Sequence, residues 1–209
     1  VTTARLAALA ILLAAFPLAY LLSPAFAVVS GIYVLLFLSY SKWLKHIPLI
    51  DVLVLATGYV LRVAAGVVLI QVERFSPWLY VVTTMLALYI GLGKRRAELN
   101  LLAGDANSHR RVLEGYTIPL LDQLITIVSS TTIIAYSLYT FSAPNVPENH
   151  AMMLTIPFVI FGVFRYLYLL QVEQRGGAPE EVVLSDPPLL ITMGLFGVTV
   201  LIIFYFSPR

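Results

Sequence analysis

The sequence of 209 residues contains no cysteine and few charged residues. Without cysteine there can be no disulfide framework, no cysteine-bound iron–sulfur cluster and no thiol chemistry. Only 11% of the residues are charged, against roughly 25% in an ordinary soluble domain, and 60% are hydrophobic. A soluble domain of this size could not cover its surface with so few charges. The composition therefore indicates an integral membrane protein.

Net charge and histidine are equally scarce. A formal net charge of +2 is too small to suggest nucleic-acid binding, which usually shows as a concentrated basic stripe, so no nucleic acid is expected as a partner. The three histidines are too far apart along the chain to form a zinc site (His46, His109 and His150). The chain also has no Walker loop, no serine nucleophile elbow and no aspartate pair of the DxxD or DxxxD type.

Long apolar runs dominate what is present. A membrane-spanning helix needs about 20 mainly apolar residues, and seven segments approach that length: 4–22, 24–40, 48–70, 77–101, 117–141, 151–172 and 187–207. They predict an all-α, polytopic transmembrane helical bundle of about seven spans, in a single integral membrane domain over residues 1–209. The first segment is long enough to be a retained helix rather than a signal peptide. Pro157 lies inside a segment and is expected to kink it.

The basic residues between the segments predict the orientation. Nine fall on one side of the membrane and two on the other, and cytoplasmic loops carry the excess. This predicts a multi-pass protein of the plasma (inner) membrane with its N-terminus in the cytoplasm and its C-terminus outside. The cytoplasmic loops are expected near 41–47, 94–116 and 172–186. Nine of the eleven acidic residues lie on or beside the same face, which indicates a polar active site there.

A first polar cluster lies around the second and third segments, with Tyr40, Lys45, Asp51, Tyr59 and Arg62. Asp51 and Arg62 are eleven residues apart, which places them within about 20° of one helix face and about 16 Å apart along the axis. A charge at that depth normally faces a bundle interior or a wet cavity. Two interpretations of Arg62 stay open, a functional role and a structural ion pair with an acid of another helix.

A second cluster lies at the cytoplasmic end of the fourth segment. Lys94 and Glu98 form an i,i+4 pair on one helix face, and Arg95 points elsewhere. An ammonium beside a guanidinium suits phosphate or pyrophosphate groups, and Glu98 could hold a divalent cation together with substrate phosphates. The alternative is a basic membrane anchor with a solvated salt bridge.

Two further polar stretches follow. The loop from Asn100 to Tyr116 is long and polar, which is typical of functional or disordered loops. Arg165 then lies inside the sixth segment, beside Tyr166 and ahead of a polar stretch that ends at Asp186. Two arginines within an apolar bundle that opens to one side suit an anionic lipid substrate.

These clusters contain a set of short motifs, each present once: Tyr40-Ser41-x-x-Leu44-Lys45, Asp51, Tyr59-x-x-Arg62-x-x-x-Gly66, Gly93-Lys94-Arg95-x-x-Glu98-Leu99, Leu113-Glu114-x-Tyr116 and Arg165-Tyr166…Pro179-Glu180…Asp186. Taken together they resemble the decaprenyl-phosphate phosphoribosyltransferase branch of the UbiA prenyltransferase superfamily. The resemblance implies a membrane enzyme with a cytoplasmic active site. Such an enzyme transfers 5-phosphoribose from phosphoribosyl pyrophosphate to a polyprenyl (decaprenyl) phosphate, with Mg²⁺ and release of pyrophosphate. The product feeds cell-wall arabinan synthesis.

The resemblance also implies nine helices, the second carrying an NDxxDxxxD motif that this sequence lacks. Its seven segments correspond to the third to ninth helices of the family. Two explanations are open: two further helices precede Val1, or the protein is a shortened form without the main metal ligands.

Residue roles follow from the resemblance as expectations. Lys94, Glu98 and Asp51 are expected to be catalytic, with Glu98 on Mg²⁺ or a ribose hydroxyl. The expected substrate-binding residues are Tyr40, Lys45, Tyr59, Arg62, Arg95, Tyr116, Arg165 and Tyr166. Two alternatives are a UbiA-type prenyltransferase that uses a prenyl diphosphate with an aromatic or other acceptor, and a noncatalytic membrane subunit or remnant. A homo-oligomer is also left open.

Overall fold

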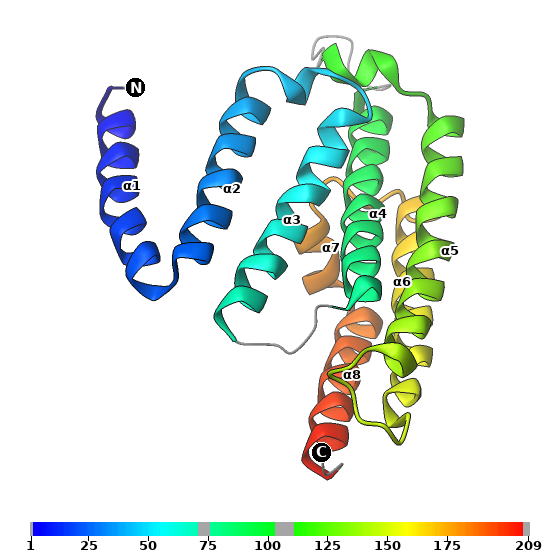
Figure 1. The fold of residues 1–209 in the computed structure, drawn as a ribbon. Coiled ribbons are helices and arrows are strands. Elements are labelled where there is room, and N and C mark those ends of the chain that lie inside the picture. The colour runs from blue at the N-terminus through cyan, green and yellow to red at the C-terminus, as the bar shows by residue number, and fades with distance from the viewer. Residues whose placement is uncertain (1, 71–75, 103–110, 207–209) are drawn as a thin grey trace.

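The computed structural model describes residues 2–70, 76–102 and 111–206, and within these ranges the regular structure is helical. The α-helices are α1 Thr2–Leu22, α2 Pro24–Lys42, α3 Ile50–Leu69, α4 Pro77–Leu102, α5 Ile118–Ser142, α6 Ile156–Gln171, α7 Pro179–Ser185 and α8 Pro187–Phe206 (Figure 1). Three short 3₁₀ helices join them: η1 Leu44–His46, η2 Arg111–Gly115 and η3 Ala151–Thr155. The expected all-α polytopic bundle is confirmed.

Each apolar segment found in the sequence forms a helix, and five meet the length and hydropathy of a membrane span. These are Pro24–Lys42, Ile50–Leu69, Ile118–Ser142, Ala151–Gln171 and Pro187–Phe206. The chain is therefore a multi-pass membrane protein. The other two segments form α1 and α4, and the total of about seven spans stays a prediction.

A single residue connects the first two helices. Ser23 lies between α1 and α2, and its hydroxyl accepts a hydrogen bond from the Phe26 N–H at 3.4 Å. Pro24 is the first residue of α2, where its missing N–H leaves no helical hydrogen bond unmade. The two helices consequently run in opposite directions from a tight turn, as the sequence predicts, and they diverge away from it (Figure 1).

The sixth segment differs from its expectation at Pro157. It begins as η3, and α6 starts at Ile156, so Pro157 lies in the first turn of α6 rather than in a helix interior. A proline in the first turn costs no helical hydrogen bond. The expected kink is wrong, and a change of helix type occurs there instead.

The most buried part of the bundle lies where α4, α5 and α6 pack together. Its fully buried side chains include Tyr89, Leu121, Ile125, Leu169 and Leu170. Helix α3 packs on α4, α2 on α3, and α8 on α6. Large apolar side chains cover the outer faces of α1, α2 and α8, as expected where helices face lipid.

One end of the bundle gathers the polar motifs. Figure 1 shows the end of α2, η1, the start of α3, the end of α4 and the start of α5 together at that end. Helix α4 continues through Leu102, so Lys94, Arg95 and Glu98 lie on its last turns. The core therefore supports a polar cluster built mainly on α3 and α4.

Candidate functional site

A buried arginine on α4 is bound by two carboxylates. Arg95 donates from Nε to Asp51 Oδ2 at 2.7 Å and from Nη1 to Glu98 Oε2 at 2.5 Å. The Arg95 side chain is 3% exposed and that of Asp51 is 0% exposed, which makes this a desolvated ion pair. Asp51 lies in the first turn of α3, where its negative charge also suits the helix N-terminus. The contact fixes the start of α3 against the end of α4.

Tyr116 completes this cluster from the segment before α5. Its hydroxyl donates to Asp51 Oδ1 at 2.7 Å and accepts a hydrogen bond from the Leu49 N–H at 2.6 Å. Burial, together with the Asp51 carboxylate, raises the pKa of Tyr116, so the hydroxyl stays protonated and donates. Leu49 has a φ of 68°, which is unfavourable for a residue with a side chain. Tyr116 thus stabilises a strained backbone two residues before Asp51.

Lys94 and Glu98 do not form the expected i,i+4 pair. Glu98 pairs with Arg95 at i,i+3 instead. Arg95 therefore belongs to this cluster, and the expectation that it points elsewhere is wrong. Lys94 is partly exposed and has no hydrogen bond or ion pair with any residue that the structure describes. Its ammonium group therefore stays uncompensated by the described carboxylates.

Arg96 was not among the residues selected from the sequence, yet it makes hydrogen bonds to several elements. Its Nε donates to Asp122 at 2.6 Å, and its Nη1 donates to the Leu170 carbonyl at 2.9 Å and to Gln174 at 3.2 Å. It is buried, so it joins α4 to α5 and to the end of α6. The Lys94-Arg95-Arg96 run was visible in the sequence. The order of residues in the run, however, does not indicate that Arg96 is the one that connects three helices.

Arg165 also has a carboxylate partner. It binds Asp186 through Nε at 3.1 Å and Nη2 at 2.6 Å, and Glu173 lies 3.6 Å from Nη2. Asp186 additionally accepts the Leu189 N–H at 3.0 Å, which caps the start of α8. In this arrangement Arg165 connects α6 to α8 and lies apart from the pairs made by Arg95.

Tyr166 lies in the packed interface between α4 and α6. Its ring meets that of Tyr89 edge-on at 5.3 Å between centroids. Gly93 on α4 leaves the space that the neighbouring Leu170 side chain occupies, since a Cβ there would lie 2.8 Å from Leu170 Cδ1. The Tyr166 hydroxyl is buried and has no hydrogen-bond partner among the described residues. Tyr89 differs, because its hydroxyl donates to the Val163 carbonyl at 2.7 Å.

Arg62 lies deeper and contacts α2. Its Nη2 donates to the Tyr33 hydroxyl at 2.5 Å, and its guanidinium lies 5.1 Å from the Tyr59 ring centroid. The structural ion pair considered for Arg62 is therefore not made with any described acid. Tyr40 lies near Phe37 on α2, and Lys45 is half-buried in η1 without an ion pair to a described residue.

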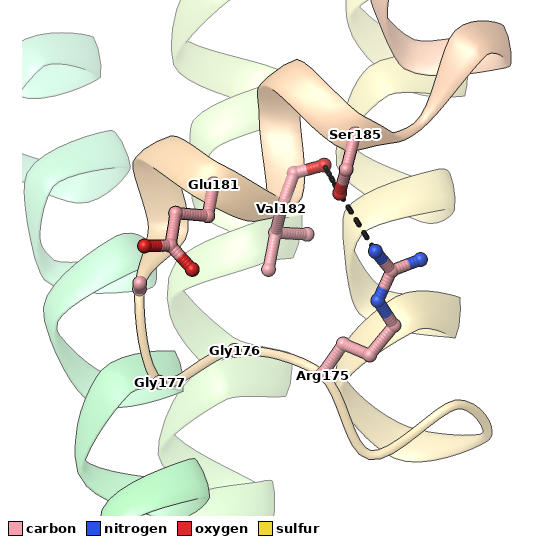
Figure 2. Close-up of a pocket in the computed structure, with 7 residues that line it drawn as sticks. Arg175, Gly176, Gly177, Glu181, Val182 and Ser185 are labelled. Carbon is pink, nitrogen blue, oxygen red and sulfur yellow. Dashed lines mark hydrogen bonds between the residues drawn. The ribbon is translucent and has the colours of Figure 1, made fainter.

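A cavity of about 360 Å³ lies between the α6–α7 connection and α7. It is lined by Arg175, Gly176, Gly177, Ala178, Glu181, Val182 and Ser185. Figure 2 shows Arg175 bent toward α7, where its Nη2 donates to the Ser185 hydroxyl at 2.6 Å. Gly176 allows this connection to pass close to the Gly93 carbonyl and Ala97 on α4.

The described acids do not form a metal site by themselves. No group of three potential ligands occurs among them, and Asp51 and Glu98 both contact Arg95. The donor set does not fit a Mg²⁺ ion held by the described chain alone. Asp105 and His109, from the expected polar loop, lie outside the described residues.

Of the residues selected from the sequence, the structure gathers Asp51, Arg95, Glu98 and Tyr116, with Lys94 on the same helix end. It does not bring Arg62 or Arg165 into contact with them.

Comparison with known proteins finds several relatives that carry the same name. The chain is 33% identical over 168 residues to the decaprenyl-phosphate phosphoribosyltransferase of Corynebacterium glutamicum, covering 80% of this chain and 50% of that protein. The enzyme of the same name from Mycobacterium tuberculosis is 29% identical, over 80% of this chain and 55% of that protein. That of Mycolicibacterium smegmatis is 26% identical, over 93% and 63%.

The chain thus spans about half the length of the first of these curated relatives. No family model matches the chain. The similarities confirm the resemblance drawn from the motifs and support the same branch of the UbiA-type prenyltransferases.

Proposed function

We propose that this chain, a homologue of the decaprenyl-phosphate phosphoribosyltransferases, carries out phosphoribosyl transfer to a membrane lipid. An oxygen of the polyprenyl (decaprenyl) phosphate forms a bond to C1 of the ribose of phosphoribosyl pyrophosphate. The bond from C1 to the pyrophosphate oxygen breaks, and pyrophosphate leaves with the electron pair. The similarity to enzymes of that name supports the choice of reaction.

The observation that carries the proposal is that Lys94, beside the Arg95 cluster, has no ion pair with a described carboxylate. Asp51 and Glu98 neutralise Arg95. Lys94, the residue before Arg95 on α4, makes no ion pair with a described carboxylate. An uncompensated ammonium at this polar helix end suits the pyrophosphate of the donor. Positive charge fixed in advance where the leaving group gains negative charge is the kind of interaction that accelerates such a reaction.

Arg95 takes a different role in this proposal from the one expected for it. Two carboxylates already bind its guanidinium, and its side chain is buried. We assign it to positioning Asp51 and Glu98 rather than to direct phosphate contact. Glu98, which is partly exposed, is then held in a fixed direction for a ribose hydroxyl.

We also propose a dependence on Mg²⁺, carried by the pyrophosphate of the donor rather than by a site within the described residues. Mg²⁺ in proteins commonly keeps substrate phosphates and only one or two carboxylates as ligands. A titration of activity with a chelator and its reversal by added Mg²⁺ would test this dependence. Activity that persists in the chelator would contradict it.

The proposed orientation puts the Lys94 end of the bundle in the cytoplasm at the plasma membrane, where a phosphorylated sugar donor is available. The excess of lysine and arginine at that side supports it.

The decisive experiment measures lipid-extractable product from labelled phosphoribosyl pyrophosphate and decaprenyl phosphate, using the chain reconstituted in nanodiscs. We expect transfer by the wild type and loss of transfer in Lys94→Ala and Glu98→Ala, with both variants still monodisperse in detergent. Lys42→Ala and Glu148→Ala are matched controls, because both side chains are exposed and lie outside the cluster. Both controls should retain activity.

Two outcomes would overturn the proposal. Transfer from a prenyl diphosphate to an aromatic acceptor, in place of phosphoribosyl transfer, would favour the prenyltransferase alternative. A folded chain that catalyses neither reaction would favour the noncatalytic alternative. Full activity in Lys94→Ala would defeat the assignment of that residue.

A further inference from the structure

We infer that the cavity at the α6–α7 connection binds the headgroup of a zwitterionic phospholipid, with the phosphate at Arg175 and the ammonium at Glu181. The cavity shares no lining residue with the cluster around Arg95, and none of its lining residues is among the site residues expected from the sequence. The inference concerns a lipid bound beside the helices, so it holds whether or not the chain transfers phosphoribose.

The two charged side chains that line the cavity lie apart. Figure 2 shows Arg175 and Ser185 on one side of Val182 and Glu181 on the other. Arg175 donates to the Ser185 hydroxyl at 2.6 Å, and it forms no ion pair with Glu181. A ligand that contacts both charges must therefore carry an anionic group at one end and a cationic group at the other.

The charges around the cavity leave one carboxylate unmatched. Arg165 binds Asp186 at 2.6 Å, and Glu173 lies 3.4 Å from Arg175 and 3.6 Å from Arg165. These two arginines and two acids balance one another. Glu181 makes no ion pair with a described residue. A purely anionic headgroup would add to its negative charge, whereas an ammonium group would neutralise it.

Arg175 still has donors for a phosphate. A guanidinium carries five N–H groups, and the contacts with Ser185 and Glu173 use one on each of two nitrogens. Arginine commonly binds phosphate oxygens through paired donors. Gly176 and Gly177 also line the cavity, and their backbone N–H groups make no hydrogen bond with a described residue. These groups therefore remain available as further donors.

The size and level of the cavity suit a lipid headgroup. Its volume of about 360 Å³ lies within the range of roughly 300–1,000 Å³ found for small-ligand sites. The residues that line it lie between two candidate membrane spans, Ala151–Gln171 and Pro187–Phe206. The headgroup region of a bilayer begins where such spans end.

Exposed apolar side chains at the edge of the cavity favour a lipid over a water-soluble zwitterion. Leu101 on α4 is 71% exposed, and a Cβ at Gly177 would lie 3.8 Å from it. Leu184, which precedes the lining residue Ser185 on α7, is 70% exposed. A soluble ligand would leave both leucines in water, whereas the acyl chains of a lipid can cover them.

Lipid retention by the purified chain tests this site without any catalytic step. Native mass spectrometry would compare phosphatidylethanolamine, phosphatidylcholine and phosphatidylglycerol with identical acyl chains. We expect the wild type to retain phosphatidylethanolamine about tenfold better than the other two, which is the effect of one hydrogen bond to a charged group. The trimethylammonium of phosphatidylcholine cannot donate to Glu181, and phosphatidylglycerol carries no cation.

Two variants address the two ends of the cavity. Glu181→Gln should remove the preference for phosphatidylethanolamine over phosphatidylcholine, and Arg175→Gln should lower the retention of both. Both side chains are exposed, so neither change is expected to unfold the chain. Glu148→Gln and Lys42→Gln are matched controls, because these exposed charges do not line the cavity, and both should behave as the wild type.

Each outcome supports or overturns the inference. Equal retention of phosphatidylethanolamine by the wild type and Arg175→Gln would overturn it, as would equal retention of phosphatidylethanolamine and phosphatidylglycerol by the wild type. Free phosphoethanolamine is a further arm, and binding as tight as that of the lipid would show a soluble ligand instead. Should Arg175→Gln fail to fold, an unchanged preference in Glu181→Gln would overturn the inference. A preference lost in Glu181→Gln would support it, even if the chain catalyses no transfer.

Discussion

Tyr116 is the residue on which the geometry of Asp51 most depends. Its hydroxyl bridges the Leu49 N–H and the Asp51 carboxylate, and Leu49 has a positive φ that few leucines adopt. Strain of this kind persists only where neighbouring contacts compensate for it. The tyrosine thus links a local backbone conformation to the position of a buried charge.

We expect Tyr116→Phe to lower the free energy of unfolding by about 1–3 kcal/mol, because a donor and an acceptor would remain buried without their partner. Thermal unfolding in detergent measures the change. Tyr20→Phe, at an exposed tyrosine of α1, serves as the control and should leave the midpoint unchanged. Equal midpoints for both variants would contradict the role given to Tyr116.

Residue types could be selected from the sequence, but their pairing could not. Asp51, Lys94, Arg95 and Glu98 stood out because charges are rare in this chain. The spacing of Lys94 and Glu98 suggested a pair on one helix face, yet Glu98 binds Arg95. Asp51 lies 44 positions away on another helix and binds Arg95. Spacing along one helix cannot predict such a long-range contact.

At the scale of elements, the segment before α5 packs tightly against the start of α3. Gly115 ends η2, and a Cβ there would lie 2.2 Å from Cγ of Pro48. A proline ring cannot turn aside as a longer side chain can. The close approach therefore requires glycine and places Tyr116 beside Asp51.

Gly115→Ala should accordingly destabilise the fold and reduce transfer, since it separates the Tyr116 segment from α3. Gly194→Ala is the matched control, because nothing lies within 4 Å of a Cβ at that position of α8. Alanine is favoured over glycine in a helix by about 1 kcal/mol, so the control should be neutral or stabilising. Unfolding midpoints of Gly115→Ala and Gly194→Ala, each compared with the wild type, test this difference. A Gly115→Ala variant as stable as the wild type would contradict the packing argument.

The link between α6 and α8 should depend on pH. Hydrogen bonding from Arg165 holds the pKa of Asp186 below its usual 3.8. A carboxyl group whose pKa is lower in the folded state stabilises the protein above the unfolded pKa, and this stabilisation is lost as pH falls through the folded value.

Asp186→Asn should therefore be less stable than the wild type at pH 7, and the difference should shrink below pH about 4. Unfolding midpoints measured between pH 7 and 3 would show this convergence. Glu148→Gln, which removes an exposed carboxylate without an ion pair to a described residue, should match the wild type at pH 7. A constant difference for Asp186→Asn across the range would exclude the ion pair as its cause.

At the scale of the whole molecule, Arg96 stands out among the described charged residues because it contacts several helices at once. It joins three helices through one side chain. Arg96→Met should cost about 1–3 kcal/mol, because the buried Leu170 carbonyl would lose its Arg96 donor and the partly exposed Asp122 would lose its ion pair. Arg175→Met, at an exposed arginine, should cost less than about 1 kcal/mol. Comparable losses in the two variants, measured by chemical unfolding, would contradict this difference.

The helical bundle as a whole was predictable because apolar length specifies a membrane helix almost by itself. The seven sequence segments correspond to α1 to α6 and α8. The short α7 was not predicted, since seven residues with two glutamates carry no apolar stripe long enough to identify. The change of helix type at Pro157 also depends on packing that the sequence pattern does not reveal.

The one-residue connection at Ser23 has a consequence for how the chain enters a bilayer. Helices α1 and α2 have no spacer that could remain in water while one of them crosses alone. Part of the backbone at their junction is already paired, with the Ser23 N–H donating to the Ala19 carbonyl and the Ser23 hydroxyl accepting from the Phe26 N–H. Such a helical hairpin is suited to insert as one unit during biosynthesis, with its tip carried through the membrane at little desolvation cost.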